Sequence, residues 1–274
     1  MRKNTMIAFP NAKINLGLRV VEKRLDGFHN IETIFIPIGL RDIIEVIPSS
    51  FTSISFSGLV VDASAEENLC MRAYNLFKAD IGCGNVSIHL HKVIPFGAGL
   101  GGGSSDAAFT LKMLTTLFQS NISTRKLKEM AGLLGSDCPF FIDNRPAIAQ
   151  GKGEILEPVS LALKGYHLVL VNPGVHVSTK EAYSCVRPRK HETSLLSLIA
   201  EPVHRWQGLI SNDFEESVFQ AHPVVAQLKQ EILNNGAIYA SMSGSGSSVF
   251  GLFEKPLIGA QELFPNYTTF SQIL

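Results

Sequence analysis

The sequence predicts an α+β protein of two domains, and three observations support this class. The chain has 274 residues, enough for one large domain or two modest ones with sizeable cores. Its first half holds strand-like runs followed by helical runs, and its second half places helical runs between apolar strands. A turn-rich passage before the strand at 166–171 sets a soft boundary near residue 160. We therefore expect a β-rich/α domain at 1–160 and an α+β domain with an antiparallel sheet at 161–274.

The elements of the first domain follow from two periodicities. Alternation of polar and apolar residues predicts strands, and apolar residues at helical spacing predict helices. The strands are expected at 12–21, 31–36, 42–47, 51–56 and 86–93. The helices are expected at 67–77, 104–118 and 124–134. Short turns separate the early strands, so we expect consecutive strands there to pair antiparallel.

The second domain shows the same signals in another order. Its strands are expected at 166–171, 236–243, 249–253 and 267–273. Its helical segments are expected at 179–186, 193–199, 213–221 and 223–233. A short helix is expected before the last strand. Strands separated by helices in this half favour an α+β layer.

Charge and hydropathy exclude several classes of protein. Lys plus Arg and Asp plus Glu each number 24, so no net charge draws the chain to nucleic acid or to an anionic membrane. No continuous run approaches the roughly 18 apolar residues of a membrane span. We expect a soluble cytoplasmic protein without nucleic-acid or membrane partners, as a monomer or a weak homodimer. Four scattered cysteines are expected to be reduced packing thiols, namely Cys70, Cys83, Cys138 and Cys185.

A glycine-rich stretch in the first domain is the strongest local signal. It reads Pro95-Phe-Gly-Ala-Gly-Leu-Gly-Gly-Gly-Ser-Ser-Asp-Ala-Ala108. Its glycines remove side-chain bulk where backbone amides can approach a ligand. Ser104, Ser105 and Asp106 are expected to open the following helix, with caps and an acid in its first turn. Amides and a helix dipole that point at one place form an anion site, and phosphate is the commonest occupant.

Two known phosphate motifs do not account for this stretch. A Walker loop needs Lys and then Ser or Thr after its last glycine, whereas Gly103 is followed by Ser104. The dinucleotide fingerprint matches Gly97-x-Gly99-x-x-Gly102 after a predicted strand. That fingerprint also requires a second strand and an acidic residue about 20 positions later, whereas another helical run follows here. The dinucleotide interpretation is therefore disfavoured.

Six other polar or aromatic residues have simple structural explanations beside functional ones. They are Lys13, Asn15, Phe28, His29, Asn68 and Asp137. The first two lie on one face of the first strand, where solvation alone accounts for them. The next two follow an Asp-Gly turn and suit an ordinary turn or core. The last two stand where helix N-caps are expected.

Three separated motifs then occur in a recognisable order. They are Pro10-x-Ala12-Lys13-Ile-Asn15-Leu16, the stretch from Pro95 to Ala108, and Met242-Ser-Gly-Ser-Gly-Ser-Ser248. With them the chain resembles the GHMP kinase superfamily over essentially its whole length. The resemblance implies a two-domain fold with the active site in the cleft between an ATP-binding first domain and a second domain that contributes to the substrate cleft.

Four further motifs narrow the resemblance. They are Asp26-Gly-Phe28-His29, Glu67-Asn68-Leu69, Gly135-Ser-Asp137-Cys-Pro139-Phe140-Phe141 and Asn172-Pro-Gly-Val175. They are similar to the branch of the superfamily that phosphorylates the 2-hydroxyl of 4-diphosphocytidyl-2-C-methyl-D-erythritol in non-mevalonate (MEP) isoprenoid synthesis. The resemblance implies ATP as co-substrate, Mg²⁺ with it, and a small-molecule partner that carries a cytidine diphosphate group.

The resemblance assigns the chemistry to two residues. Asp137 would accept the proton of the substrate hydroxyl as general base. Lys13 would keep Asp137 ionised and stabilise the charge that develops on the moving phosphoryl group.

Binding residues are implied in the same way. The ATP site would comprise Asn68, Leu69, Lys92, Pro95, Gly97, Gly99, Leu100, Gly101, Gly102, Gly103, Ser104 and Ser105, with the first three at the adenine. The substrate site would comprise Asn15, Phe28, His29, Asp137, Thr179, Tyr183, Gly244 and Ser245. His29 would bind cytosine between the rings of Phe28 and Tyr183. Many relatives have Tyr in place of Phe28, a change that keeps stacking but loses a phenol contact.

Two alternatives remain open from the sequence. One is another GHMP kinase, acting on mevalonate, homoserine or a sugar, against which the aromatic and histidine pair at 28–29 argues because a base-recognising pocket uses such a pair. The other is a non-catalytic nucleotide- or RNA-binding module, which the balanced charge disfavours. The cluster at 243–248 also suits a plain tight turn between strands. No spaced set of carboxylates identifies metal ligands.

Overall fold

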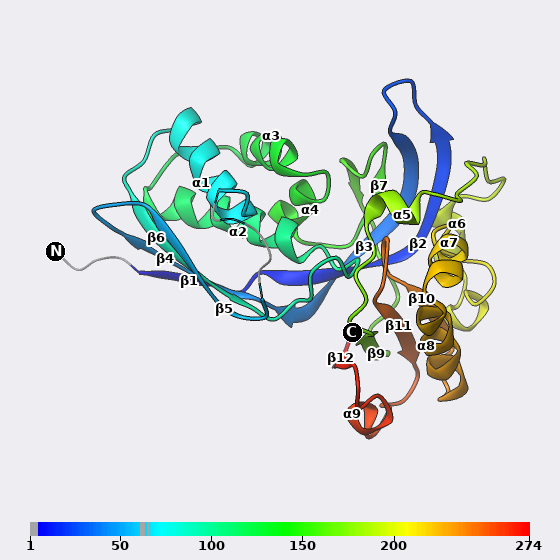
Figure 1. Ribbon diagram of the computed structural model, residues 1–274. Coiled ribbons are helices and arrows are strands. Elements are labelled where there is room, and N and C mark those ends of the chain that lie inside the picture. Colours follow the sequence, from blue (N-terminus) through cyan, green and yellow to red (C-terminus); the bar gives the residue numbers. More distant parts are fainter. Residues whose placement is uncertain (1–4, 61–63, 65) are drawn as a thin grey trace. The chain divides into compact units, whose positions relative to one another are not determined.

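The computed structural model describes residues 5–60, 64 and 66–274 (Figure 1). Its backbone contacts divide into two compact units, each built from separate stretches of the chain. The first unit comprises the described residues of 1–12, 38–96 and 101–145. The second unit comprises 13–37, 97–100 and 146–274.

This division differs from the single cut expected near residue 160, because residues 13–37, the greater part of an early hairpin, belong to the second unit. The hairpin strands are β2 (Asn11–Lys23) and β3 (His29–Arg41), and they share a sheet of order β2-β3-β7-β8 with β7 (Ala147–Gln150) and β8 (Ile155–Pro158). Residues 33–35 of β3 pair antiparallel with residues 147–149 of β7. The alternation of polar and apolar residues predicted β2 and β3 as strands, but it did not predict that β3 pairs with β7.

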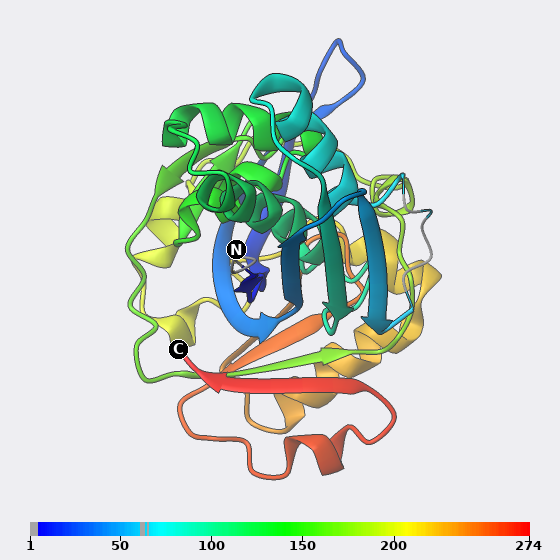
Figure 2. The same cartoon turned by 90° about the vertical axis from the view of Figure 1, so that its left-hand side faces the viewer.

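The first unit is a four-stranded sheet with helices on one face. The sheet order is β1 (Met6–Ala8), β4 (Ile43–Pro48), β6 (Val86–Lys92) and β5 (Ser53–Gly58). The helices are α1 (Leu69–Asp80), α2 (Gly102–Leu117), α3 (Thr124–Leu134) and α4 (Cys138–Asp143). Helix α2 lies on β1 and β4 and packs against the other three helices, which Figure 2 shows on the same side of the sheet.

Strands β4 and β5 do not pair with each other, so the expectation that consecutive early strands pair antiparallel is wrong here. Strand β6 lies between them, because residues 43–48 run antiparallel to residues 86–91 while residues 53–58 run parallel to residues 87–92. Parallel strands need a long crossover connection, and the segment between β5 and β6 contains helix α1.

The second unit contains the expected antiparallel sheet. Its order is β10 (Tyr239–Met242), β11 (Val249–Phe253), β9 (His167–Asn172) and β12 (Thr268–Ile273), with every neighbouring pair antiparallel. Strands β9 (green) and β12 (red) run side by side in Figure 2. The helices are α5 (Thr179–Ala182), α6 (Leu195–Ile199), α7 (Glu215–Ala221), α8 (Pro223–Asn234) and α9 (Ala260–Leu263), with a 3₁₀ turn at Val203–Arg205.

One apolar cluster holds the second unit together. Helix α8 packs on β10 and β11 and buries Val225, Leu228 and Ile232. Leu18 and Val20 of β2 belong to the same cluster. Strand β2 is therefore part of the core that residues 169–264 build.

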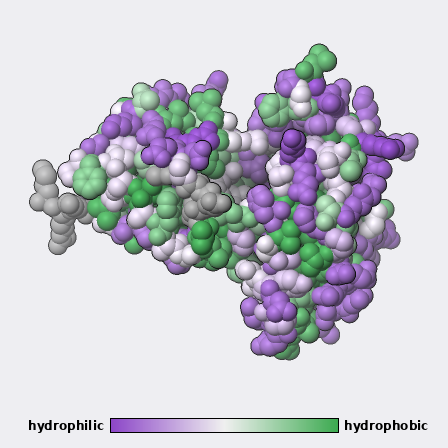
Figure 3. Space-filling model, viewed as in Figure 1, coloured by the Kyte–Doolittle hydropathy of each residue, from purple (hydrophilic) through white to green (hydrophobic). Residues whose placement is uncertain are grey.

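Apolar side chains and cysteines differ in their exposure across the molecule. Leu25, in the turn between β2 and β3, is fully exposed, and Figure 3 shows a hydrophobic patch at that tip. Within the described residues, no helix is both long and apolar enough to cross a bilayer. All four cysteines are free thiols, but only Cys70 and Cys138 are buried, so the packing role expected of Cys185, which is exposed, is wrong. Burial raises the pKa of the Cys138 thiol to about 11.

Candidate functional site

The glycine loop enters helix α2 without a side-chain cap. The helix begins at Gly102, two residues before the expected start, and its N-cap is Gly101 in a left-handed conformation with φ 69°. The first helical hydrogen bond joins the amide of Ser105 to the carbonyl of Gly101 at 2.9 Å. The amides of residues 102–104 therefore have no acceptor within the helix, which is the arrangement that binds anions. The first turn contains no acid, because Asp106 lies beyond it.

Close backbone contacts fix Gly99, in the part of the loop that belongs to the second unit. Gly99 has φ 73°, and a Cβ added there would lie 1.8 Å from the carbonyl oxygen of Ser243. Its own carbonyl accepts hydrogen bonds from the Ser243 hydroxyl at 2.9 Å and from the Lys13 ammonium at 3.1 Å. Only glycine combines this conformation with this approach.

The second glycine cluster is a turn between β10 and β11, as its simpler interpretation predicted. Asn212 holds the turn by donating to the carbonyls of Met242 and Gly244, both at 2.8 Å. The Ser243 hydroxyl accepts from the amide of Asn15 at 3.1 Å. The turn therefore contacts both the glycine loop and strand β2 within the second unit.

Lys13 is buried in strand β2 with 3 % of its surface exposed, so simple solvation does not explain it. Its ammonium group donates to the Asn15 side-chain oxygen and lies 5.0 Å from the centroid of the Phe35 ring. Asn15 in turn donates to the Thr33 hydroxyl at 3.0 Å, which orients the carboxamide. The network fixes the direction of a buried cation, and such a cation must be paired and hydrogen-bonded to be tolerated.

Asp137 is the N-cap residue of helix α4, as its simpler interpretation predicted. Its backbone is already helical, with φ −83° and ψ −15°, and its side chain makes no capping hydrogen bond. The Ser136 hydroxyl donates to its Oδ1 at 3.4 Å. The expected N-cap position is therefore confirmed, but the half-buried carboxylate makes no capping bond there.

Asn68 and Leu69 stand at the start of helix α1 in the first unit. Asn68 is the N-cap, and its Oδ1 accepts from the Cys70 amide at 2.9 Å, as the capping interpretation predicted. A Cβ added to Gly103 would lie 3.3 Å from a methyl carbon of Leu69. The structure therefore brings Leu69 beside the glycine loop.

Lys92 has a different environment from the one that the resemblance implied. It ends strand β6 with 1 % of its surface exposed. Its ammonium group forms ion pairs with Asp42 and, at 2.8 Å, with Asp106. The expected contact between Lys92 and adenine stays a prediction.

The residues expected around a cytosine ring lie in the second unit. His29 stacks on Tyr183 with ring centroids 4.6 Å apart and an interplanar angle of 19°. Tyr183 also meets Phe214 edge to face at 4.6 Å. Burial, and secondarily the charge of Lys23, lowers the pKa of His29, which favours the neutral imidazole that can both donate and accept hydrogen bonds.

Phe28 is 57 % exposed. The Lys152 ammonium lies 4.8 Å from the centroid of its ring, a cation–π distance. Thr179 is exposed at the start of α5, and Tyr183 is the C-cap of the same helix. Ser245 is half-buried at the tip of the second glycine turn.

The sequence did not predict a role for four side chains of these networks. They are Thr33, Lys152, Asn212 and Ser243. Ser243 did fall inside a quoted motif, but its hydroxyl was not assigned a contact. Lys152 stands in a Gly-Lys-Gly-Glu turn, and that turn was the available signal.

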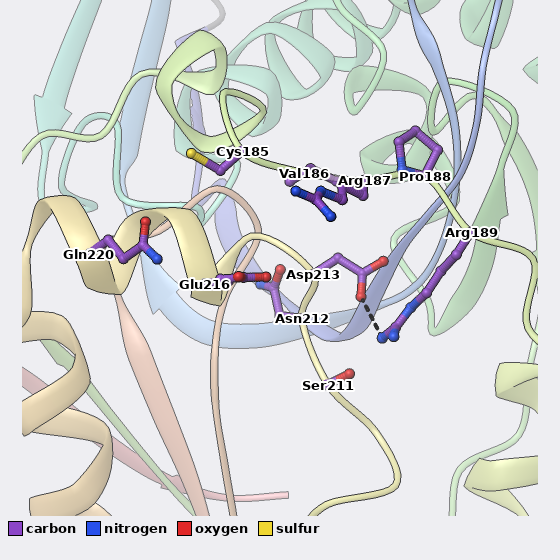
Figure 4. A pocket seen from close by; sticks show the side chains of 10 residues that line it. All are labelled: Cys185, Val186, Arg187, Pro188, Arg189, Ser211, Asn212, Asp213, Glu216 and Gln220. Atoms are coloured by element: carbon purple, nitrogen blue, oxygen red, sulfur yellow. Dashed lines mark ion pairs between the residues drawn. The ribbon is translucent and has the colours of Figure 1, made fainter.

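A separate pocket of about 630 Å³ lies in the second unit between residues 185–189 and 211–220 (Figure 4). Arg187 and Glu216 reach it from opposite sides, and Arg189 pairs with Asp213 at 3.6 Å. None of the predicted site residues lines it.

The helix-forming end of the glycine loop and the turn at 243–248 both fall in regions that match known protein families. The family model for the N-terminal domain of GHMP kinases matches residues 68–145, and the model for the C-terminal domain matches residues 194–261. A protein of Parabacteroides distasonis named 4-diphosphocytidyl-2-C-methyl-D-erythritol kinase is 55 % identical over 92 % of this chain and 93 % of its own. The chain belongs to the GHMP kinase family. A Bacteroides thetaiotaomicron protein of the same name is 50 % identical over 91 % of this GHMP kinase and 92 % of its own length.

Solved structures agree with the family assignment. A crystal structure of 4-(cytidine 5'-diphospho)-2C-methyl-D-erythritol kinase has a TM-score of 0.81 and 35 % identity, with 97 % of this chain and 98 % of that chain covered. A homoserine kinase from Cytophaga hutchinsonii has a TM-score of 0.69 at 16 % identity, covering 99 % and 95 %. The second likeness shows that the two share the GHMP kinase fold. The fold expected from the sequence is thereby confirmed.

Proposed function

We propose that this GHMP kinase transfers the γ-phosphoryl group of ATP to the 2-hydroxyl of 4-diphosphocytidyl-2-C-methyl-D-erythritol, giving the 2-phosphate and ADP in the MEP route to isoprenoid precursors. The observation that carries the proposal is the 55 % identity, over more than nine-tenths of both chains, to a kinase named for this substrate. The resemblance of the Asp26–His29 turn to that branch of the family supports the same choice.

The ATP phosphates are proposed to bind the glycine loop. The uncapped amides of residues 102–104 and the helix dipole of α2 supply donors and positive potential for a triphosphate. Leu69, beside Gly103, supplies an apolar wall close to the same loop. Asn68 and Leu69 remain the proposed contacts of the adenine.

The chemistry is proposed to rest on Asp137 and Lys13. Asp137 takes the proton from the 2-hydroxyl as the oxygen attacks the γ-phosphorus, and the bond from that phosphorus to the β-phosphate oxygen of ADP breaks. Lys13 stabilises the negative charge that builds on the transferred oxygens. Asn15 fixes the direction of the Lys13 ammonium, so Asn15 is proposed as a positioning residue in addition to a substrate contact.

The cytidine end is proposed to bind His29, Tyr183 and Phe28. The neutral imidazole of His29 matches the mixed donors and acceptors of a cytosine edge. His29 and Tyr183 stack on each other, which fixes the plane of the imidazole whose nitrogens are proposed to hydrogen-bond the base. Phe28 presents an exposed ring on the same turn.

Magnesium is proposed to arrive with the ATP phosphates. Within the described residues no three His, Cys, Asp or Glu side chains gather at metal-binding distances. Mg²⁺ prefers oxygen ligands and usually keeps waters and substrate phosphates among them. The Ser105 hydroxyl is buried and has no hydrogen-bond partner in the described part of the chain, so it fits as one protein oxygen. The ion would neutralise phosphate charge during transfer.

A coupled assay of ADP release tests the proposal. Purified protein is given ATP with the cytidylyl substrate, mevalonate, homoserine or galactose in separate reactions. Release with the cytidylyl substrate alone is expected. Release only with one of the other three compounds would assign a different GHMP kinase activity.

The role of Asp137 has its own variant. Asp137→Asn is expected to lower turnover by roughly 100-fold or more while ATP binding by calorimetry stays within about twofold, because only proton acceptance is lost. Asp143→Asn, at the other end of α4 and paired with Lys128, is the matched control. Equal turnover in Asp137→Asn and the control would remove Asp137 from the mechanism.

A further inference from the structure

A buried ion cluster lies behind the glycine loop in the first unit. Its members are Asp42, Lys92 and Asp106, which expose 0 %, 1 % and 2 % of their surfaces. The Lys92 ammonium pairs with one oxygen of each carboxylate. Three ionisable side chains at this depth are costly to bury and persist only when their pairing is well made. Because the cluster is costly to bury, we looked to its contacts for a role. None of its three residues takes part directly in the proposed phosphoryl transfer.

Asp42 ties the cluster to the entry of the glycine loop. Its second oxygen accepts from the amides of Val93, at 2.6 Å, and Ile94, at 2.8 Å. These are the two residues that follow strand β6 and precede Pro95. Asp42 itself stands between β3 and β4, and its amide donates to the Pro10 carbonyl at 2.9 Å. One carboxylate therefore anchors the start of the loop to the sheet.

Asp106 ties the same ammonium to the exit of the loop. It lies in helix α2, and its Oδ2 accepts from Lys92 at 2.8 Å. At Gly102, the first residue of that helix, an added Cβ would lie 2.9 Å from the Lys92 nitrogen. The ammonium is therefore packed directly behind the backbone whose amides are proposed to hold phosphate.

The position of the ammonium also argues against direct contact with a nucleotide. Two carboxylates already take its hydrogen bonds, and almost none of its surface is accessible. The Phe96 ring lies 5.1 Å away, measured from the nitrogen to the ring centroid. A ligand would have to displace both buried carboxylates to reach it.

We propose that Asp42, Lys92 and Asp106 are positioning residues that fasten the entry and the exit of the glycine loop to one buried ammonium, and so hold its amides where they bind a polyphosphate. The inference rests on the proposed ATP site, and it replaces an adenine contact of Lys92 by an action on the phosphate subsite. The ligand chemistry is a chain of phosphates, and the base plays no part.

Asp106→Leu distinguishes an action of the ion cluster on the phosphate subsite from a contact of Lys92 with adenine. The change removes the tie to helix α2 but leaves Lys92 beside Asp42 as a charge-balanced pair. Calorimetric titration of the otherwise unaltered protein with ATP, and separately with inorganic tripolyphosphate, measures each subsite. Both affinities are expected to fall by roughly tenfold or more, because a loop displaced by about an ångström loses its aligned donors. Asp106→Asn, which keeps an oxygen acceptor, is expected to restore both affinities to within about threefold of the original.

Asp143→Leu is the control, since it removes the carboxylate partner of a lysine elsewhere in the same unit. Unchanged tripolyphosphate affinity in Asp106→Leu would overturn the proposal. So would a loss of ATP affinity alone, because that pattern belongs to a base contact. If neither ATP nor tripolyphosphate binds the original protein, the proposed ATP site itself fails.

Folding of Asp106→Leu is checked by circular dichroism. If that variant is unfolded, the double variant Lys92→Met with Asp106→Leu takes its place, because it leaves Asp42 with its two backbone amide donors. The double variant is expected to weaken ATP and tripolyphosphate in the same proportion. A fully retained tripolyphosphate affinity in it would overturn the proposal equally.

Discussion

Alanine at Gly99 tests whether the glycine loop depends on close backbone approach. The new Cβ would lie 1.8 Å from the Ser243 carbonyl oxygen, whereas Cβ contacts under 3.0 Å are essentially never seen. The two backbones must therefore separate by about an ångström. That movement weakens the bonds that the Gly99 carbonyl accepts from Lys13 and Ser243.

The cost has two parts. The left-handed conformation, φ 73°, costs an alanine roughly 1–2 kcal/mol, and forcing backbone apart in a packed region adds roughly 1–3 kcal/mol. We expect a loss of unfolding free energy of roughly 2–5 kcal/mol in total. We also expect turnover to fall by about 100-fold, because the loop and the Lys13 ammonium both shift.

Gly208→Ala is the matched control. Gly208 also has a left-handed conformation, φ 87°, but nothing lies within 4 Å of an added Cβ. Urea denaturation and steady-state ADP release are measured for both variants. Gly208→Ala should lose only the conformational part, roughly 1–2 kcal/mol, and keep full turnover. Equal stability and equal turnover in the two variants would refute the close approach at Gly99.

Three further predictions follow from the buried networks. Asn15→Leu removes the side-chain acceptor of the Lys13 ammonium, so turnover should fall by roughly tenfold or more while calorimetric ATP affinity changes little. Burial raises the pKa of the Asp106 carboxyl from 3.8 to about 7, while the charge of Lys92 lowers it and the charge of Asp42 raises it. Between these two pH values the folded protein therefore keeps the Asp106 proton, whereas the unfolded chain has lost it. Its contribution to stability is therefore lost as pH rises from about 4 to about 7, by up to roughly 4 kcal/mol, and urea denaturation should show a slope there that Asp106→Asn lacks. Because the pKa of His29 is lowered, the KM for the cytidylyl substrate should stay flat from pH 8 to about 6.5 and rise only in more acidic assays.

Much of the local structure could be predicted from the chain because it depends on neighbouring residues. The spacing of apolar residues gave α1, α3 and α8 nearly to their observed ends. Asn68 was correctly expected to be an N-cap, because a cap depends on the two or three residues that follow it.

The pairing of strands could not be predicted in the same way. Alternation identifies a strand but says nothing about its partner, so the place of β6 between β4 and β5 was missed. The membership of residues 13–37 in the second unit was missed for the same reason, since β3 pairs with a strand more than a hundred residues away.

The candidate site could likewise be predicted only in part. Motif resemblance selected Lys13, Asn15 and Gly99, and the structure brings these three together within one unit. The side chains that orient them came from elsewhere in the chain: Thr33, Asn212 and Ser243. Lys92 shows the converse, because its burial between two carboxylates depends on residues 50 positions before it and 14 after it.

The early position of strand β2 has a consequence for biosynthesis. Its backbone binds Ser211, Asp213 and Ser243, which are made about 190 to 230 residues later. At the usual 5 to 20 residues per second, the ribosome needs roughly 10 to 45 s to deliver these partners. Most of the first unit, at 38–145, is complete well before then. During that interval Leu18 and Val20, in the strand that carries Lys13, lack the apolar side chains of residues 169–264 that bury them in the folded protein.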